Sequence, residues 1–198
     1  MNRLIIIGAS GHGKVVADIA KLNEYKDIAF LDDDENVKEC AGYPVIGKSN
    51  EAPDGDIFVA IGNADVRKRL TKLYNNRKQI VLIHPNAVIA SDVKIGEGSV
   101  VMAGAVINPG VIIGKGCIVN TSSSIDHDCI IEDYVHVAVG AHLCGTVHIG
   151  EKTWIGAGAT VSNNIDICDE CMIGAGAVVI NDIYKCGTYV GVPARIKH

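Results

Sequence analysis

Residues 89–119 read IASDVKIGEGSVVMAGAVINPGVIIGKGCIV, and a branched aliphatic residue returns at every sixth position of this stretch. The repeat continues without an exception to Val179. A small or β-branched residue stands two positions before each aliphatic residue, as Ala105 does before Ile107, and glycine often follows it. A period of six fits neither an α-helix of 3.6 residues per turn nor one long strand of period two. We therefore expect short strands joined by regular corners.

Three six-residue faces would make one coil of a prism, so that residues eighteen apart in the sequence stack on each other. The aliphatic residue of each hexad then points into the prism, and backbone hydrogen bonds run from coil to coil, as in other solenoids. Glycine near the corners tolerates a positive φ. This spacing predicts a parallel β-helix over residues 84–198.

Residues 1–83 lack the hexad repeat and read as alternating strands and helices. In the second helix, an apolar stripe is expected to pack inward, and the cations Arg67, Lys68, Arg69 and Lys72 are expected to face solvent. The expected strands are 4–7, 28–31, 57–61 and 80–83, and the expected helices are 14–22 and 64–74. This order predicts a small α/β unit with a parallel sheet, about half a Rossmann fold.

A glycine-rich turn, Gly8-Ala9-Ser10-Gly11-His12-Gly13, joins the first expected strand to the first helix. Backbone N–H groups at a helix N-terminus suit a phosphate or pyrophosphate. Asp32, about two dozen positions later, resembles the carboxylate that binds a ribose hydroxyl in dinucleotide sites. Because the unit is too short for a second mononucleotide half, we expect a nucleotide or a nucleotide-sugar. A tight turn without a ligand is the alternative.

Charge, apolar run lengths and cysteine usage exclude several classes of partner and site. A net charge of -5 and a pI near 5.8 give no electrostatic case for nucleic acid or an anionic membrane. No apolar run has the length of a signal peptide or a membrane span. Three of the seven cysteines fall in small inward positions of the repeat, which favours a reducing, cytoplasmic setting. Cys168 and Cys171 form a CxxC without a second pair, so no metal site is expected.

The densest polar segment of the repeat region is 120–128, which ends in Asp126-His127-Asp128. An imidazole between two carboxylates is well suited to take a proton at neutral pH. A surface histidine in a polar loop is the alternative. His136, His142 and His148 recur six residues apart, so they are expected on successive faces, where a neighbouring subunit could bring one of them to His127.

The chain resembles the bacterial sugar acetyltransferases that acetylate a UDP-linked 4-amino-sugar, the bacillosamine and perosamine N-acetyltransferases, which are close to the sialic acid O-acetyltransferases. The resemblance covers nearly the full length. It is carried by the glycine-rich turn, Phe30-Leu31-Asp32-Asp33, Ala60-Ile61-Gly62-Asn63, Asn120-Thr121-Ser122-Ser123, Ile125-Asp126-His127-Asp128 and Gly191-Val192-Pro193-Ala194. It implies a left-handed parallel β-helix, acetyl-CoA as co-substrate, and a homotrimer with CoA lying between neighbouring solenoids.

The same resemblance implies a role for each site residue. His127 would be the general base and Asp128, where many relatives have Glu, would raise its basicity. Asn120 and His136 would line the same site, with His136 near the thioester. The remaining positions are Ser10, Gly11 and His12 for the diphosphate, Asp32 and Asp33 for the uridine, Gly62 for the backbone near the nucleotide, and Ala157 and Ala175 for backbone contacts to acetyl-CoA.

We therefore expect a Rossmann-like nucleotide-sugar-binding domain at 1–83 and a left-handed β-helix acetyltransferase domain at 84–198. The expected reaction is direct acetyl transfer from acetyl-CoA to the 4-amino group of a UDP-linked amino-sugar. Three other functions remain open at this point: a sugar O-acetyltransferase of the sialic acid type, a zinc lyase like the β-helix carbonic anhydrases, and a nucleotide-binding module without catalysis.

Overall fold

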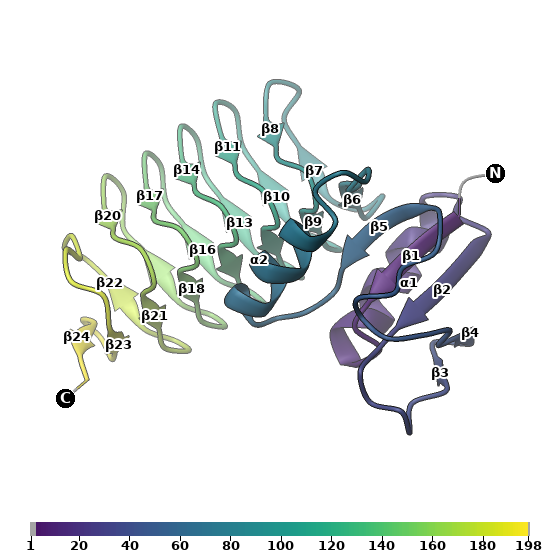
Figure 1. Cartoon of the computed structure of the whole chain (residues 1–198). Helices are drawn as coiled ribbons and strands as arrows, with labels where there is room; N and C mark the ends of the chain where they lie inside the picture. Colours follow the sequence, from purple (N-terminus) through teal and green to yellow (C-terminus); the bar gives the residue numbers. More distant parts are fainter. Residues whose placement is uncertain (1–2, 198) are drawn as a thin grey trace. The chain divides into compact units, whose positions relative to one another are not determined.

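A computed structural model of the chain describes residues 3–197. They form two compact units, one reaching to Pro85 and the other beginning at Asn86. The first is an α/β unit and the second a parallel β-solenoid, which confirms the predicted fold class (Figure 1). None of the helices in the described range is long and apolar enough to cross a membrane.

Three parallel strands form the sheet of the first unit in the order β2-β1-β5. The elements of this unit are β1 (Arg3–Ile7), α1 (Gly11–Leu22), β2 (Asp27–Leu31), the hairpin of β3 (Glu39–Cys40) and β4 (Tyr43–Pro44), β5 (Asp56–Val59), α2 (Ala64–Leu73) and β6 (Leu82–Ile83). The predicted strands and helices are all present, although α1 begins within the glycine turn and β5 ends two residues early. Because the strands are parallel, the segments that follow β1, β2 and β5 leave the same edge of the sheet.

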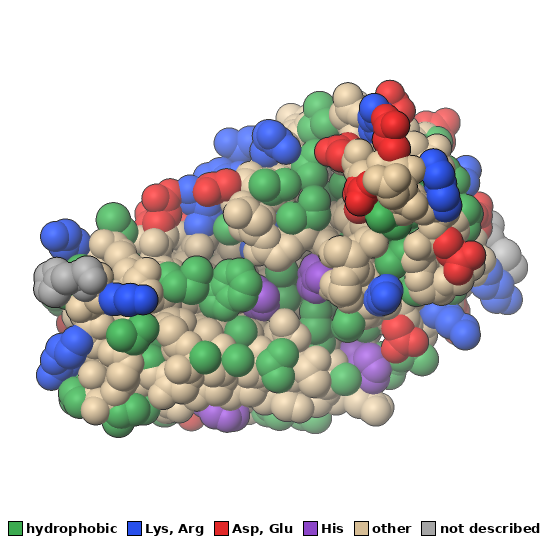
Figure 2. Space-filling view, turned by 90° about the horizontal axis from the view of Figure 1, so that it is seen from below, with side chains coloured by type: hydrophobic (Ala, Val, Ile, Leu, Met, Phe, Trp, Pro, Cys, Tyr) green, Lys and Arg blue, Asp and Glu red, His purple; other side chains and the backbone are tan. Residues whose placement is uncertain are grey.

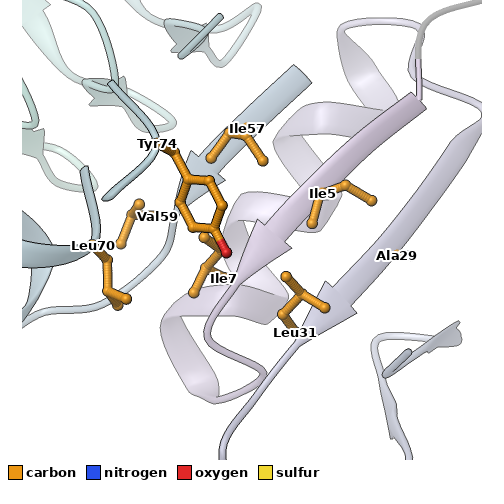
Figure 3. Close-up of a cluster of buried hydrophobic side chains, with 8 residues drawn as sticks. All are labelled: Ile5, Ile7, Ala29, Leu31, Ile57, Val59, Leu70 and Tyr74. Atoms are coloured by element: carbon orange, nitrogen blue, oxygen red, sulfur yellow. The ribbon is translucent and has the colours of Figure 1, made fainter. Parts of the chain in front are cut away.

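A cluster of buried apolar side chains holds the sheet to α2 (Figure 3). Ile5, Ile7, Ala29, Leu31, Ile57 and Val59 come from the strands, and Leu70 and Tyr74 come from α2 and its C-terminal end. The expectation for α2 was wrong at Arg67, which is only 1% exposed. Its guanidinium donates hydrogen bonds to the carbonyl oxygens of Ile61 and Gly62. These bonds offset part of the free energy that burying the charge costs.

Strands of two residues, with a three-residue strand near the C-terminal end, build the solenoid and stack in three rows. The first row is β7 (Val88–Ile89), β10 (Val106–Ile107), β13 (Ser124–Ile125), β16 (His142–Leu143), β19 (Thr160–Val161) and β22 (Val178–Val179); the second is β8 (Lys94–Ile95), β11 (Ile112–Ile113), β14 (Ile130–Ile131), β17 (His148–Ile149) and β20 (Asp166–Ile167). The third contains β9 (Val100–Val101), β12 (Ile118–Val119), β15 (His136–Val137), β18 (Trp154–Ile155), β21 (Met172–Ile173), β23 (Thr188–Val190) and β24 (Arg195–Ile196).

Residues eighteen apart pair in all three rows as far as Val179, where the hexad repeat ends, as the sequence predicts. Ile107 lies beside Ile125, and Ile125 beside Leu143. The inward aliphatic residues from Val101 to Val179 are each at most 2% exposed. Since each also abuts the residue of the next coil, the hexad repeat forms a continuous apolar column along the axis.

The polar side chains in small inward positions form hydrogen bonds with backbone groups of the solenoid. Ser99 donates its hydroxyl to the carbonyl of Gly114 at 2.9 Å, and Thr153 donates to Cys168 at 3.0 Å. The corners hold many residues with left-handed backbone, and several are not glycine: φ is 61° at Asp128 and 59° at Thr146. The coil therefore tolerates side chains in this conformation at its corners.

Two neighbouring residues test the inward column directly. Ile131 is 1% exposed whereas Ile130, in the same strand, is 47% exposed. We expect Ile131→Ala to lower the free energy of unfolding by about 2–5 kcal/mol, because it leaves a cavity. Ile130→Ala should cost less than about 1 kcal/mol. Urea unfolding of both variants measures the difference, and equal losses would contradict the packing.

Candidate active site

The glycine turn of the first unit is tightly packed at two positions and open at a third. A side chain at Gly8 would lie 2.8 Å from the carbonyl oxygen of Ala60, and one at Gly13 would collide with the carbonyl of Gly8. A side chain at Gly11 would meet nothing within 4 Å. Ser10 is the N-cap of α1 and makes no side-chain cap bond. The first turn of α1 is therefore open to an anion at the end where the helix dipole favours one.

His12 lies in this first turn, next to a buried cation. Its Nε2 atom is buried and has no hydrogen-bond partner among the described residues. Burial, and then the charge of Arg67, lower the pKa of His12 to about 4. The imidazole is therefore neutral at physiological pH and can donate one hydrogen bond. Sequence reasoning missed Arg67, since a cation on a helix is ordinarily solvated.

Asp32 and Asp33 follow β2 and are both held by local hydrogen bonds. Asp32 accepts from the backbone N–H of Ala9 at 2.7 Å and thereby ties β2 to the glycine turn. Asp33 accepts from the backbone N–H and hydroxyl of Ser49 at 2.9 and 3.0 Å, and these bonds lower its pKa. Asp32 lines a cavity of about 340 Å³ and Asp33 another of about 550 Å³. The two carboxylates thus line different cavities.

Gly62 follows β5, and its carbonyl accepts from Arg67 at 2.8 Å. A side-chain carbon at Gly62 would meet no other atom within 4 Å. Asn63, the next residue, caps α2 by accepting from the backbone N–H of Val66 at 3.0 Å. Gly62 is thus held at the same sheet edge as the glycine turn and Asp32.

In the solenoid, His127 and Asp128 form a direct pair at the corner after β13. The Nδ1–H of His127 donates to Oδ2 of Asp128 at 2.8 Å, which leaves the lone pair on Nε2. The side chains are 57% and 66% exposed, so a substrate can reach them. Histidine side chains reach the surface on the face of the molecule seen in Figure 2.

Backbone geometry explains how an aspartate reaches the ring. Asp128 has φ 61°, and its N–H donates to the carbonyl of Pro109 on the preceding coil at 3.0 Å. The left-handed conformation turns its short side chain back toward His127. The hydrogen bond to Asp128, and then the negative charge of Asp126, raise the pKa of His127. Asn108 fixes Asp126 by donating to its Oδ1 at 2.7 Å.

Asn120 and His136 form a second pair, in which the histidine is buried and the asparagine is partly exposed. The side-chain amide of Asn120 donates to Nε2 of His136 at 3.1 Å. Asn120 also accepts from the N–H of Thr121 at 2.8 Å, which fixes its orientation. The ring of Trp154 lies against that of His136, with 4.4 Å between centroids. His136 is only 8% exposed, so its neighbours restrict the position of its ring.

The two pairs lie at different edges of the prism. Asn120 follows β12, and His127 follows β13. Ala157 and Ala175 follow β18 and β21, in the same row of strands as β12. Both alanines are exposed and lie one coil apart. Asn120, Ala157 and Ala175 thus follow one edge, whereas the pair of His127 and Asp128 lies along another.

The other histidines of the repeat lie on other faces, as expected from their spacing. His142 is in β16 and contacts the hydroxyl of Ser124 at 2.8 Å, while His148 in β17 contacts Asp166 at 2.9 Å and Glu132 at 3.0 Å. Within residues 3–197, no three histidine, cysteine or acidic side chains are grouped to hold a metal ion.

Comparison with known proteins identifies the two units. Residues 3–73 match the PglD N-terminal domain, and residues 79–109 and 146–181 match the bacterial transferase hexapeptide repeat. The chain is 38% identical to UDP-N-acetylbacillosamine N-acetyltransferase of Bacillus subtilis (strain 168), over about half of each protein (52%).

Two solved structures extend over the whole chain. The acetyltransferase domain of PglB from Neisseria gonorrhoeae FA1090, in complex with acetyl coenzyme A, is 42% identical with a TM-score of 0.94, and the match covers 99% of both chains. PerB from Caulobacter crescentus, in complex with CoA and GDP-perosamine, is 34% identical with a TM-score of 0.94, covering 100% of this chain and 98% of PerB. The chain therefore belongs to the family of bacterial hexapeptide-repeat sugar N-acetyltransferases with a PglD-type N-terminal domain.

Proposed function

We propose that this protein transfers the acetyl group of acetyl-CoA to the 4-amino group of a UDP-linked amino-sugar. The observation that carries the proposal is the exposed pair of His127 and Asp128 on a hexapeptide solenoid. Relatives over the full chain bind acetyl-CoA, or CoA with a nucleotide-linked amino-sugar. Residues 1–83 would be the nucleotide-sugar-binding domain and 84–198 the acetyltransferase domain.

In this mechanism the Nε2 atom of His127 is the general base. It takes a proton from the sugar amine as the nitrogen attacks the thioester carbonyl, while Asp128 holds the ring and stabilises the imidazolium. A backbone N–H stabilises the oxyanion of the tetrahedral intermediate. The C–S bond then breaks, and the departing CoA thiolate takes the proton back from the imidazolium. The products are an N-acetylated sugar and free CoA.

Acetyl-CoA would lie along the edge that carries Asn120, Ala157 and Ala175, with His136 near the thioester. Small exposed residues on this edge leave the backbone accessible to the donor. His127 lies at another edge, so we infer a homotrimer in which one site draws on two chains. Sedimentation of the protein as a monomer at assay concentrations, with activity retained, would contradict this arrangement.

The acceptor would bind in the first unit. The open first turn of α1, with Ser10, Gly11 and neutral His12 beside buried Arg67, suits the diphosphate. Asp32 and Asp33, with the cavities they line, would take the uridine, and Gly62 would lie against the nucleotide. Because both carboxylates already accept local hydrogen bonds, backbone groups around them would contribute much of the base recognition.

Amine acetylation is favoured over the O-acetyl alternative, because two relatives at 30% identity or more, named by their reaction, are N-acetyltransferases. A cytoplasmic location is also proposed. It is supported by seven free cysteines, because reduced thiols are typical of a reducing compartment. Detection of the protein only outside the cytoplasm after cell fractionation would contradict it.

Removing the base tests the mechanism. His127→Ala should lower kcat by about 10²–10⁴-fold, the usual contribution of general base catalysis. His142→Ala is the matched control. It removes an exposed histidine from β16, the strand that pairs with β13 on the next coil, and should leave kcat unchanged. Release of free CoA thiol with a UDP-4-amino-sugar measures both. An active His127→Ala enzyme would remove this residue from the mechanism.

The pH dependence tests the role of Asp128. A base must be unprotonated to act, so kcat should fall as pH drops through the raised pKa of His127. Asp128→Asn removes the interaction that contributes most to this shift, so the acidic limb of the profile should move to lower pH. A limb at the same pH in wild type and variant would show that Asp128 does not tune the base.

Binding of the nucleotide tests the first unit. Loss of the His12 donor should weaken the affinity for UDP by about 10–150-fold, since a hydrogen bond to a charged group contributes about 1.5–3 kcal/mol. The wild-type contribution of His12 should not change between pH 5.5 and 8, because its pKa is about 4. Calorimetric titration of His12→Ala with UDP, and with acetyl-CoA as the unaffected control, measures this.

A further inference from the structure

Two glycines lie against the pair of His127 and Asp128, one on each neighbouring coil. Gly145 is eighteen residues after His127, and Gly110 is eighteen residues before Asp128. A side-chain carbon at Gly145 would be 2.5 Å from Nε2 and 2.6 Å from Cε1 of His127. A side-chain carbon at Gly110 would be 2.5 Å from Oδ1 of Asp128. Each functional group thus occupies the space of a missing side chain.

Backbone conformation does not account for glycine at either position. Gly145 is outside the left-handed region, so any residue could adopt its backbone. Gly110 has φ 79°, but Asp128, Thr146 and Asn164 stand at the same corner of the next three coils with φ between 58° and 61°. The corner therefore accepts a side chain in this conformation on three coils out of four.

The space beside Gly145, where a side chain would stand, is occupied by the imidazole of His127. The three atoms nearest to a side chain at Gly145 all belong to the His127 ring. The coils are held together there by backbone bonds, from Thr146 to the His127 carbonyl at 2.8 Å and from Asn164 to the Gly145 carbonyl at 3.0 Å. These bonds involve no side chain, so a methyl group at Gly145 would act on the ring.

We propose that Gly145 and Gly110 are positioning residues, whose missing side chains seat the His127 imidazole and the Asp128 carboxylate in contact with each other. This rests on the proposed function of His127 as the base. With the space at Gly145 filled, the ring swings toward solvent, where it already has more than half of its surface. Folding then loses little, whereas Nε2 leaves its place and Nδ1 leaves Asp128.

Gly145→Ala is the direct test. We expect kcat with acetyl-CoA and a UDP-4-amino-sugar to fall by about 10²-fold, since misplacement by about 1 Å can cost that much. Both KM values should stay within twofold and the melting temperature close to that of wild type. Asn163→Ala, which changes a side chain at the same corner one coil further on, is the control and should keep wild-type kcat.

Titration of the histidine signals by NMR separates this proposal from the catalytic one, because it requires no substrate. The His127 signal, assigned by its loss in His127→Ala, should titrate at a lower pH in Gly145→Ala than in wild type. An unchanged titration in a folded Gly145→Ala protein would overturn the proposal. Absence of acetyl transfer by the wild type would instead overturn the proposed function.

A second variant covers a failure to fold. If Gly145→Ala does not fold, His127→Ala/Gly145→Ala removes the ring that the new methyl group would meet. Recovery of a folded protein in the double variant supports the proposal. Failure of the double variant to fold, with His127→Ala alone folded, would overturn it, because the clash would then lie elsewhere.

Discussion

Stacking of residues eighteen apart is the constraint on which the rest of this structure depends. Each inward aliphatic residue packs on the one a coil away, and parallel backbone bonds join the coils. Neither contact is available to a single coil, so the repeat is stable only as a stack. The same register decides which corner residues become neighbours, and it thereby brings Gly145 beneath His127 and Pro109 beside Asp128.

The pair of His127 and Asp128 stands on a rigid support that is mostly backbone. An exposed ion pair contributes little to stability, so the contact of His127 with Asp128 is better understood as orienting the ring than as holding the fold. The support comes from backbone bonds of the corner and from Asn108, which fixes Asp126. The first unit differs, because buried Arg67 donates to the Gly62 carbonyl there, and burial, together with the charge of Arg67, keeps His12 neutral.

Much of the fold was predictable, because a period of six admits few structures. The three rows, the inward aliphatic residues and the separate faces of His136, His142 and His148 all follow from it. Burial of Arg67 was not predictable, because helical periodicity predicts that a cation is solvated and gives no information on the carbonyl groups of the preceding loop. The hand of the coil is likewise not given by spacing.

The candidate site was only partly predictable. The segment around His127 stood out by composition, but the left-handed backbone that lets Asp128 reach the ring has no sequence signal, because aspartate and glycine both occur at this corner. Register arithmetic does place Gly145 one coil from His127. It cannot say that the ring leans toward that glycine, because side-chain direction depends on the rotamer.

The most direct test of the central claim is a substrate panel with wild-type protein. Thiol release from acetyl-CoA would be measured with UDP-linked and GDP-linked 4-amino-sugars, the matching 4-hydroxy sugars and free sialic acid, and products would be identified by mass spectrometry. The account predicts turnover with a UDP-linked amine, an amide product, and none with hydroxyl acceptors. Turnover with sialic acid or a 4-hydroxy sugar alone would contradict it.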